Sequence, residues 1–120
     1  MEMWNIIFYK RENGTRPVDE FIKQLPQKHF AKAIKEIKAL RIYGNQWKYP
    51  HVSHIDGKLW ELRIKSASDI SRIFYFFHVD NNIVLLHGFV KKTQKTPQRE
   101  IERAKHYLDD YLRSQNNENT

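Results

Sequence analysis

Basic side chains mark the ends of three neighbouring strands that the sequence predicts. They are Arg63, Arg72, Lys91 and Lys92. In an antiparallel meander the second strand begins beside the end of the first and the end of the third, so these side chains should converge at one end of the sheet. Like charges repel, and such a cluster needs a reason when Glu61 is the only acid nearby. The pattern favours a site for a polyanion, and the alternative is a set of ordinary solvated strand ends.

The stretch HGFVKKTQKTPQREI, residues 87–101, is the densest part of this pattern. An apolar run, NIVLL, passes directly into four cations before the first acid, and these are Lys91, Lys92, Lys95 and Arg99. The whole chain has 21 Lys and Arg against 14 Asp and Glu, a formal net charge of +7, and most of the excess lies between residues 57 and 99. This balance favours a nucleic acid or an acidic protein as partner.

Composition and motifs exclude several classes of function. The chain has no cysteine, which removes disulfides, thiolate nucleophiles, zinc-finger sites and iron–sulfur clusters. It has neither a G-x-S-x-G motif nor a glycine-rich phosphate loop. Its N-terminal apolar run is too short for a signal peptide, and no run approaches the ~20 residues of a membrane span. We therefore expect a cytoplasmic protein that has no membrane partner and needs no cofactor.

The histidines give a weak metal signal. His51 and His54 form the motif HVSH, and two imidazoles on a loop without a third ligand rarely hold zinc. We therefore predict no metal site. His54 remains a candidate proton carrier, because the reference pKa of histidine, about 6.5, suits that task.

Hydrophobic periodicity predicts the elements that must position these residues. Pro17 suits the first position of one helix, Pro26 ends that helix and starts a second, and Gly44 is a natural stop. Thr96 and Pro97, a capping residue and a proline, begin the last helix. In chain order we expect a strand at residues 4–9, an αα-hairpin at 17–43, a loop at 45–57, strands at 58–65, 70–79 and 83–92, and a helix from 96.

The order β-α-α-β-β-β-α predicts an α+β fold. In it the N-terminal strand and the three-stranded meander form a small antiparallel sheet, with the αα-hairpin and the C-terminal helix packed against it. The strand at 70–79 is almost wholly apolar, which suits a central strand covered on both faces. We expect a single domain over residues 1–113 and a polar tail at 114–120.

Four blocks of the sequence resemble a known family. They are, in order, RPVDEFIKQLP, LWELRI, SRIFYFF and VLLHGFVKKTQKTPQREIERA. Together they make the chain, from Trp4 to about Leu112, similar to the HigB-type, phage-derived branch of the RelE/ParE toxin–antitoxin superfamily. The last block is the most specific. The resemblance implies a single RelE/HigB-like domain that acts as the toxin of a type II toxin–antitoxin system.

The activity that the resemblance implies is that of an RNA endonuclease, a ribosome-dependent mRNA interferase that inhibits translation. In such toxins the ribose 2′-hydroxyl attacks the adjacent phosphate without a metal, and basic groups on the sheet are catalytic. Carried onto this chain, the catalytic set is Arg63, Arg72, Lys91 or Lys92, with Glu61 beside them. The set expected to bind RNA, largely through its backbone, is Lys65, Lys95, Arg99 and His54.

The roles of these groups follow from the chemistry that the resemblance implies. In-line attack builds negative charge on the phosphorane, and we assign its stabilisation to Arg72, since a guanidinium stays charged and binds phosphate through two hydrogen bonds. Arg63 would orient the phosphate, and Glu61 would accept a proton or anchor Arg63. A lysine crowded by cations has a lowered pKa, which makes Lys91 or Lys92 the acid–base candidate. RelE has a tyrosine just after its basic strand end, whereas TQKTPQREI contains no aromatic.

The implied partners are mRNA on the ribosome and a cognate helix-turn-helix antitoxin, similar to HigA, in a higher-order assembly with operator DNA. Two alternatives stay open. One is a ParE-like inhibitor that binds DNA gyrase and cleaves nothing, although the ParE branch generally lacks this basic set. The other is a nucleic-acid-binding module without catalysis, which the charge alone supports.

Overall fold

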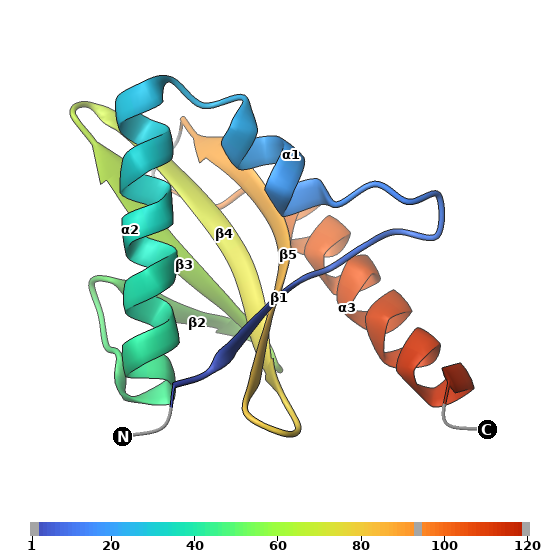
Figure 1. The fold of residues 1–120 in the computed structure, drawn as a ribbon. Helices are drawn as coiled ribbons and strands as arrows, with labels where there is room; N and C mark the ends of the chain where they lie inside the picture. The colour runs from blue at the N-terminus through green and yellow to red at the C-terminus, as the bar shows by residue number, and fades with distance from the viewer. Residues whose placement is uncertain (1–2, 93–94, 119–120) are drawn as a thin grey trace.

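A five-stranded sheet separates two hydrophobic cores (Figure 1). The structure is a computed structural model that describes residues 3–92 and 95–118. In chain order its elements are β1 (Asn5–Phe8), α1 (Pro17–Lys23), α2 (Gln27–Tyr43), the short 3-10 helix η1 (Gly44–Gln46), β2 (Val52–Asp56), β3 (Leu59–Ser66), β4 (Asp69–His78), β5 (Asn82–Lys91) and α3 (Gln98–Glu118). This is the α+β fold class that the sequence predicted.

Strand β4 lies at the centre of the sheet, as its apolar sequence predicted. The strand order is β1-β5-β4-β3-β2. Because side chains alternate between the two faces of a strand, Ile73 and Tyr75 enter the core under α1 and α2, whereas Phe74 and Phe76 enter the core under α3. All four side chains are fully buried. A buried side chain of this size contributes about 1.5–3 kcal/mol of transfer free energy, so β4 stabilises both cores.

The helices α1 and α2 begin and end where proline and glycine predicted. Pro17 is the first residue of α1, Pro26 immediately precedes α2, and Gly44 follows α2 with a φ of 50°. The two helices form the predicted αα-hairpin over one face of the sheet, and α3 covers the other (Figure 1). Among the described residues, no helix is both long enough and apolar enough to cross a membrane.

Two features of the sheet differ from the prediction. The segment expected to be a loop, 45–57, contains β2, which pairs antiparallel with β3 and makes the order β-α-α-β-β-β-β-α. Its Pro and Gly residues flank the strand, and five residues at a sheet edge are too few to show clear alternation. The second difference is that β1 runs parallel to β5. Strand direction depends on the path of the chain, which the pattern of residues in a strand does not encode.

The last helix begins at Gln98 rather than at Thr96. The Thr96 hydroxyl donates to Glu61 Oε2 at 3.3 Å, and the Pro97 carbonyl accepts the first bonds of the helix, from the backbone N–H groups of Glu100 and Ile101. The predicted polar tail at 114–120 begins inside α3, which continues to its end at residue 118, and residues 119–120 lie outside the described part of the chain.

Gly88 allows α1 to lie close to β5. A Cβ placed on Gly88 would be 2.4 Å from Phe21 Cδ2 and 2.9 Å from Phe21 Cγ. Atoms do not approach this closely without overlap, so a side chain at this position requires the ring of Phe21 to move.

We expect Gly88→Ala to lower the free energy of unfolding by about 1–3 kcal/mol, because overpacking displaces the ring or the strand. Urea unfolding measures the loss. Combining it with Phe21→Leu gives a double-mutant cycle, in which the smaller side chain should restore at least ~0.5 kcal/mol. Additive effects of the two substitutions would contradict this packing.

His87 connects the sheet to the first turn of α3. Its Nε2 lies 3.3 Å from Glu100 Oε1, and its ring stacks on Phe74 and Phe89 at centroid distances of 6.3 and 6.2 Å. Burial lowers the pKa of His87, and the contact with Glu100 opposes this effect without cancelling it. The folded protein therefore binds a proton at His87 less readily than the unfolded chain does.

The free energy of unfolding should decrease as the pH falls through about 6.5, the pKa of a histidine in an unfolded chain. Below that pH the unfolded state takes up a proton that folded His87 resists, so stability is lost. Urea midpoints at about pH 7.5 and about pH 5.5 measure the change. Between these two pH values His87→Gln should lose less unfolding free energy than the wild type does. His106→Gln, at an exposed position, should lose as much as the wild type. Equal losses in the wild type and His87→Gln would contradict this assignment.

Candidate functional site

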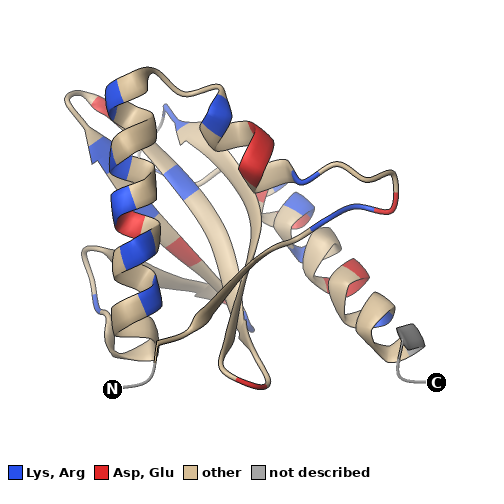
Figure 2. Cartoon of the chain, in the orientation of Figure 1, with Lys and Arg blue, Asp and Glu red and all other residues tan. Residues whose placement is uncertain are grey.

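A cleft of about 840 Å³ opens on the α3 side of the sheet, toward the turn between β3 and β4. Figure 2 shows basic positions on the strands toward this turn and along α2. The lining includes the whole set predicted to be catalytic, Glu61, Arg63, Arg72, Lys91 and Lys92. The cleft is completed by Tyr49, Ser53, Ile55, Ile70 and Thr96.

The register of the strands brings the cations together. Arg63 on β3 lies opposite Arg72 on β4, and Ile70 on β4 lies opposite Lys91 on β5. Residues opposite one another in an antiparallel pair share a face, as do residues two apart on one strand. Arg63, Arg72 and Lys91 therefore project to the same side of the sheet, as the sequence predicted.

Glu61 and Arg72 form a buried ion pair inside the cleft. Glu61 is only 1% exposed, and its Oε1 lies 2.9 Å from Arg72 Nη1. Glu61 was expected to anchor Arg63, but it lies opposite Phe74, which makes Arg72 its diagonal neighbour on β4 and places the guanidinium within reach. Removing one partner of such a pair costs about 3–5 kcal/mol, because the other charge stays buried.

Each of the two arginines has a buried donor without a partner among the described residues. The Nε atoms of Arg63 and Arg72 are buried, and no group in the described part of the protein bonds to either. Burial is the main cause of a lowered pKa at the Arg72 guanidinium, and the nearby charge of Glu61 acts against it. A guanidinium remains charged despite such a shift, so Arg72 presents a fixed cation to the cleft.

The two lysines of the cleft differ in their surroundings. Lys91 is half-buried, and burial lowers the pKa of its amine, with the cation of Arg72 as the next largest cause. Lys92 is exposed. A lysine with a lowered pKa gives up its proton more readily at neutral pH, so Lys91 fits acid–base work better than Lys92 does.

The residues predicted to bind RNA are dispersed. Lys65 lies beyond Arg63 on β3 and lines a second groove, whereas Lys95 and Arg99 are exposed outside the cleft lining. His54 pairs with Trp60, its ring lies 5.1 Å from that indole, and its Nε2 is 2.7 Å from the Gly57 carbonyl. Because Trp60 packs on the α2 side of the sheet, His54 points away from the cleft. Within the described residues, no three His, Cys, Asp or Glu side chains are placed to hold a metal ion.

Tyr49 and Thr96 are cleft residues that the sequence did not predict. The segment after β5 has no aromatic residue, whereas the loop before β2 supplies Tyr49, which is 79% exposed, to the cleft. The sequence feature that could have indicated this role of Tyr49 is an aromatic residue beside proline in the polar stretch WKYPH. The sequence indicates only a helix cap at Thr96, because the contact with Glu61 joins residues far apart in sequence.

A protein-family model matches most of the chain. The model of the family described as "Phage derived protein Gp49-like (DUF891)" matches residues 20–109, more than half of the chain. The matched span runs from α1 into α3 and contains every strand residue of the cleft. No curated protein matches the chain. This match shows that the chain belongs to the Gp49-like family of phage-derived proteins, a RelE/HigB-like toxin family.

Proposed function

We propose that this chain is the HigB-type toxin of a type II toxin–antitoxin pair and that it stops translation by cutting mRNA on the ribosome. The observation that carries the proposal is the convergence of Arg63, Arg72 and Lys91 around the buried carboxylate of Glu61 in one cleft. Such a cluster of fixed cations favours a ligand that concentrates negative charge, and family membership makes mRNA the expected ligand.

The proposed reaction needs no metal. The 2′-oxygen of a ribose bonds to the adjacent phosphorus, the bond from phosphorus to the 5′-oxygen breaks, and the proton lost by the 2′-hydroxyl is balanced by one gained at the 5′-oxygen. Arg72 stabilises the charge that builds on the phosphorane, and Arg63 orients the phosphate. Glu61 holds the Arg72 guanidinium in place. Lys91 serves the proton exchange, since the pKa of its amine is lowered.

Tyr49 gives the cleft a surface on which a base can stack. It is 79% exposed and lies on the same cleft as the two arginines. Stacking of a base on an aromatic ring is worth about 1–3 kcal/mol and does not depend strongly on which base it is. In the cell the toxin would be held inactive by a small cognate helix-turn-helix antitoxin, in a higher-order assembly with operator DNA.

Arg72→Lys should lower the rate of mRNA cleavage by about 10²–10³-fold, because the lysine keeps a charge near Glu61 but loses the two-pronged contact with phosphate. Induced expression, growth and mapping of cleavage within codons measure the effect. Lys58→Ala, at an exposed position outside the cleft, is the control and should stay toxic. Continued growth while soluble wild-type protein accumulates would refute the toxin proposal, and DNA breaks with intact mRNA would point to gyrase instead.

Lys91 and Lys92 form a matched pair that separates catalysis from binding. Lys91→Arg keeps the charge but removes a group able to exchange its proton, so cleavage should slow by about 10²-fold or more. Lys92→Ala should weaken RNA binding in a salt-dependent way and leave the rate at saturating RNA unchanged. Cleavage by purified toxin on programmed ribosomes measures both. Full activity of Lys91→Arg would remove Lys91 from the acid–base role.

A further inference from the structure

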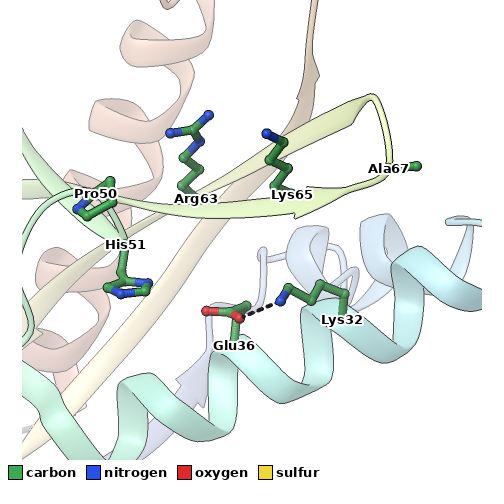
Figure 3. Close-up of a pocket in the computed structure, with 7 residues that line it drawn as sticks. All are labelled: Lys32, Glu36, Pro50, His51, Arg63, Lys65 and Ala67. Carbon is green, nitrogen blue, oxygen red and sulfur yellow. Dashed lines mark ion pairs between the residues drawn. The ribbon is translucent and has the colours of Figure 1, made fainter.

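A second groove, of about 470 Å³, lies beside the cleft along the edge of β3 (Figure 3). Lys32 and Glu36 rise into it from α2, and His51 points toward the helix from the loop before β2. Arg63 and Lys65 project from β3 away from α2. Arg63 lines both this groove and the cleft, so the two hollows meet at its side chain.

The groove exists because β2 covers only part of β3. The register of the two strands ends with Val52 opposite Leu62, and one further backbone bond joins Arg63 N to the His51 carbonyl at 2.9 Å. From Ile64 to Ser66, no described strand pairs with β3 on this side. The chain that leads into β2 therefore lies away from this part of β3, and the side chains of Arg63 and Lys65 border an open edge.

A ladder of aromatic rings ends in this groove. The rings of Tyr43 and Trp47 lie 5.6 Å apart, and those of Trp47 and His51 stack at 4.8 Å with an interplanar angle of 16°. His51 is exposed at the end of the ladder. Trp47 holds the imidazole from one side and so orients it for a further flat group. The same loop sends Tyr49 into the cleft, so it supplies one ring to each hollow.

The charges of the groove complement a phosphate backbone. Lys32 is paired at 3.3 Å with Glu36, the acid of the groove lining, and among the described residues neither Arg63 nor Lys65 forms an ion pair. Arg63 also has a buried Nε to which no described group bonds. Aromatic faces beside a track of cations are the combination that binds single-stranded nucleic acid, since bases stack on the rings while phosphates contact the cations.

We propose that this groove binds the single-stranded RNA that flanks the phosphate in the cleft, with a base on His51 and the backbone on Lys65. The strand would pass over Arg63 from one hollow to the other. The nature of the RNA rests on the function proposed above, whereas the binding itself does not depend on cleavage. A paired base is already stacked within a helix, so the groove should discriminate against duplex RNA.

Fluorescence anisotropy tests this with a labelled single strand of about 12 nucleotides. Its riboses are 2′-O-methylated, so attack by a 2′-hydroxyl cannot occur and binding is read without cleavage. His51→Ala should weaken binding about tenfold, and His51→Phe, which keeps a stacking surface, should restore most of the affinity. Lys65→Ala should reduce the salt slope by about 0.7. His106→Ala and Lys58→Ala, both exposed and away from the groove, should match the wild type.

Two results would overturn the inference: wild-type affinity in both His51→Ala and Lys65→Ala, or equally tight binding of a duplex of the same sequence. The outcome is separable from that of the proposed function. If Arg72→Lys abolishes cleavage while the groove variants bind normally, the groove inference fails and the nuclease stands. If the wild type cuts no mRNA while His51→Ala and Lys65→Ala still lose affinity for the single strand, the groove stands and the nuclease fails.

Discussion

The ion pair between Glu61 and Arg72 is the contact on which the geometry of the cleft depends. A carboxylate that is 1% exposed requires a compensating charge, and the guanidinium at 2.9 Å supplies it. Thr96 bonds to the same carboxylate at 3.3 Å, so the segment before α3 is tied to the sheet at this point. A single acid thus positions one cation and one border of the cleft.

The two cores of the protein hold this pair in place. Leu62 and Ile73 pack under α2 on one face of the sheet, while Phe74 and Phe76 pack under α3 on the other. Arg72, near the start of β4, therefore lies where the α3 core gives way to solvent. His87 on β5 contacts Glu100 in the first turn of α3, and this contact holds the start of the helix against the sheet at the edge of the α3 core. The cations of the cleft need not organise the fold, because apolar burial does so around them.

Arg63 relates the two hollows of the surface. It lies opposite Arg72 in the register but borders the unpaired edge of β3, and it lines both the cleft and the groove. The loop between η1 and β2 also contributes to both hollows, because Tyr49 lines the cleft and His51 lines the groove. One strand end and one loop thus supply cations and rings to two hollows that share Arg63, an extended arrangement that suits a flexible polyanion better than a compact ligand.

The sequence by itself determined every element except β2 and η1, the central place of β4 and the convergence of Arg63, Arg72 and Lys91. These follow from local periodicity, proline and glycine signals, and the alternation of side chains in a meander. Only the tertiary structure decided the pairing of Glu61 with Arg72, the strand β2, the parallel direction of β1, the position of His54 on the far face and the arrival of Tyr49 in the cleft. Each of these depends on how segments distant in the chain meet, and no local pattern of residue types encodes such a meeting.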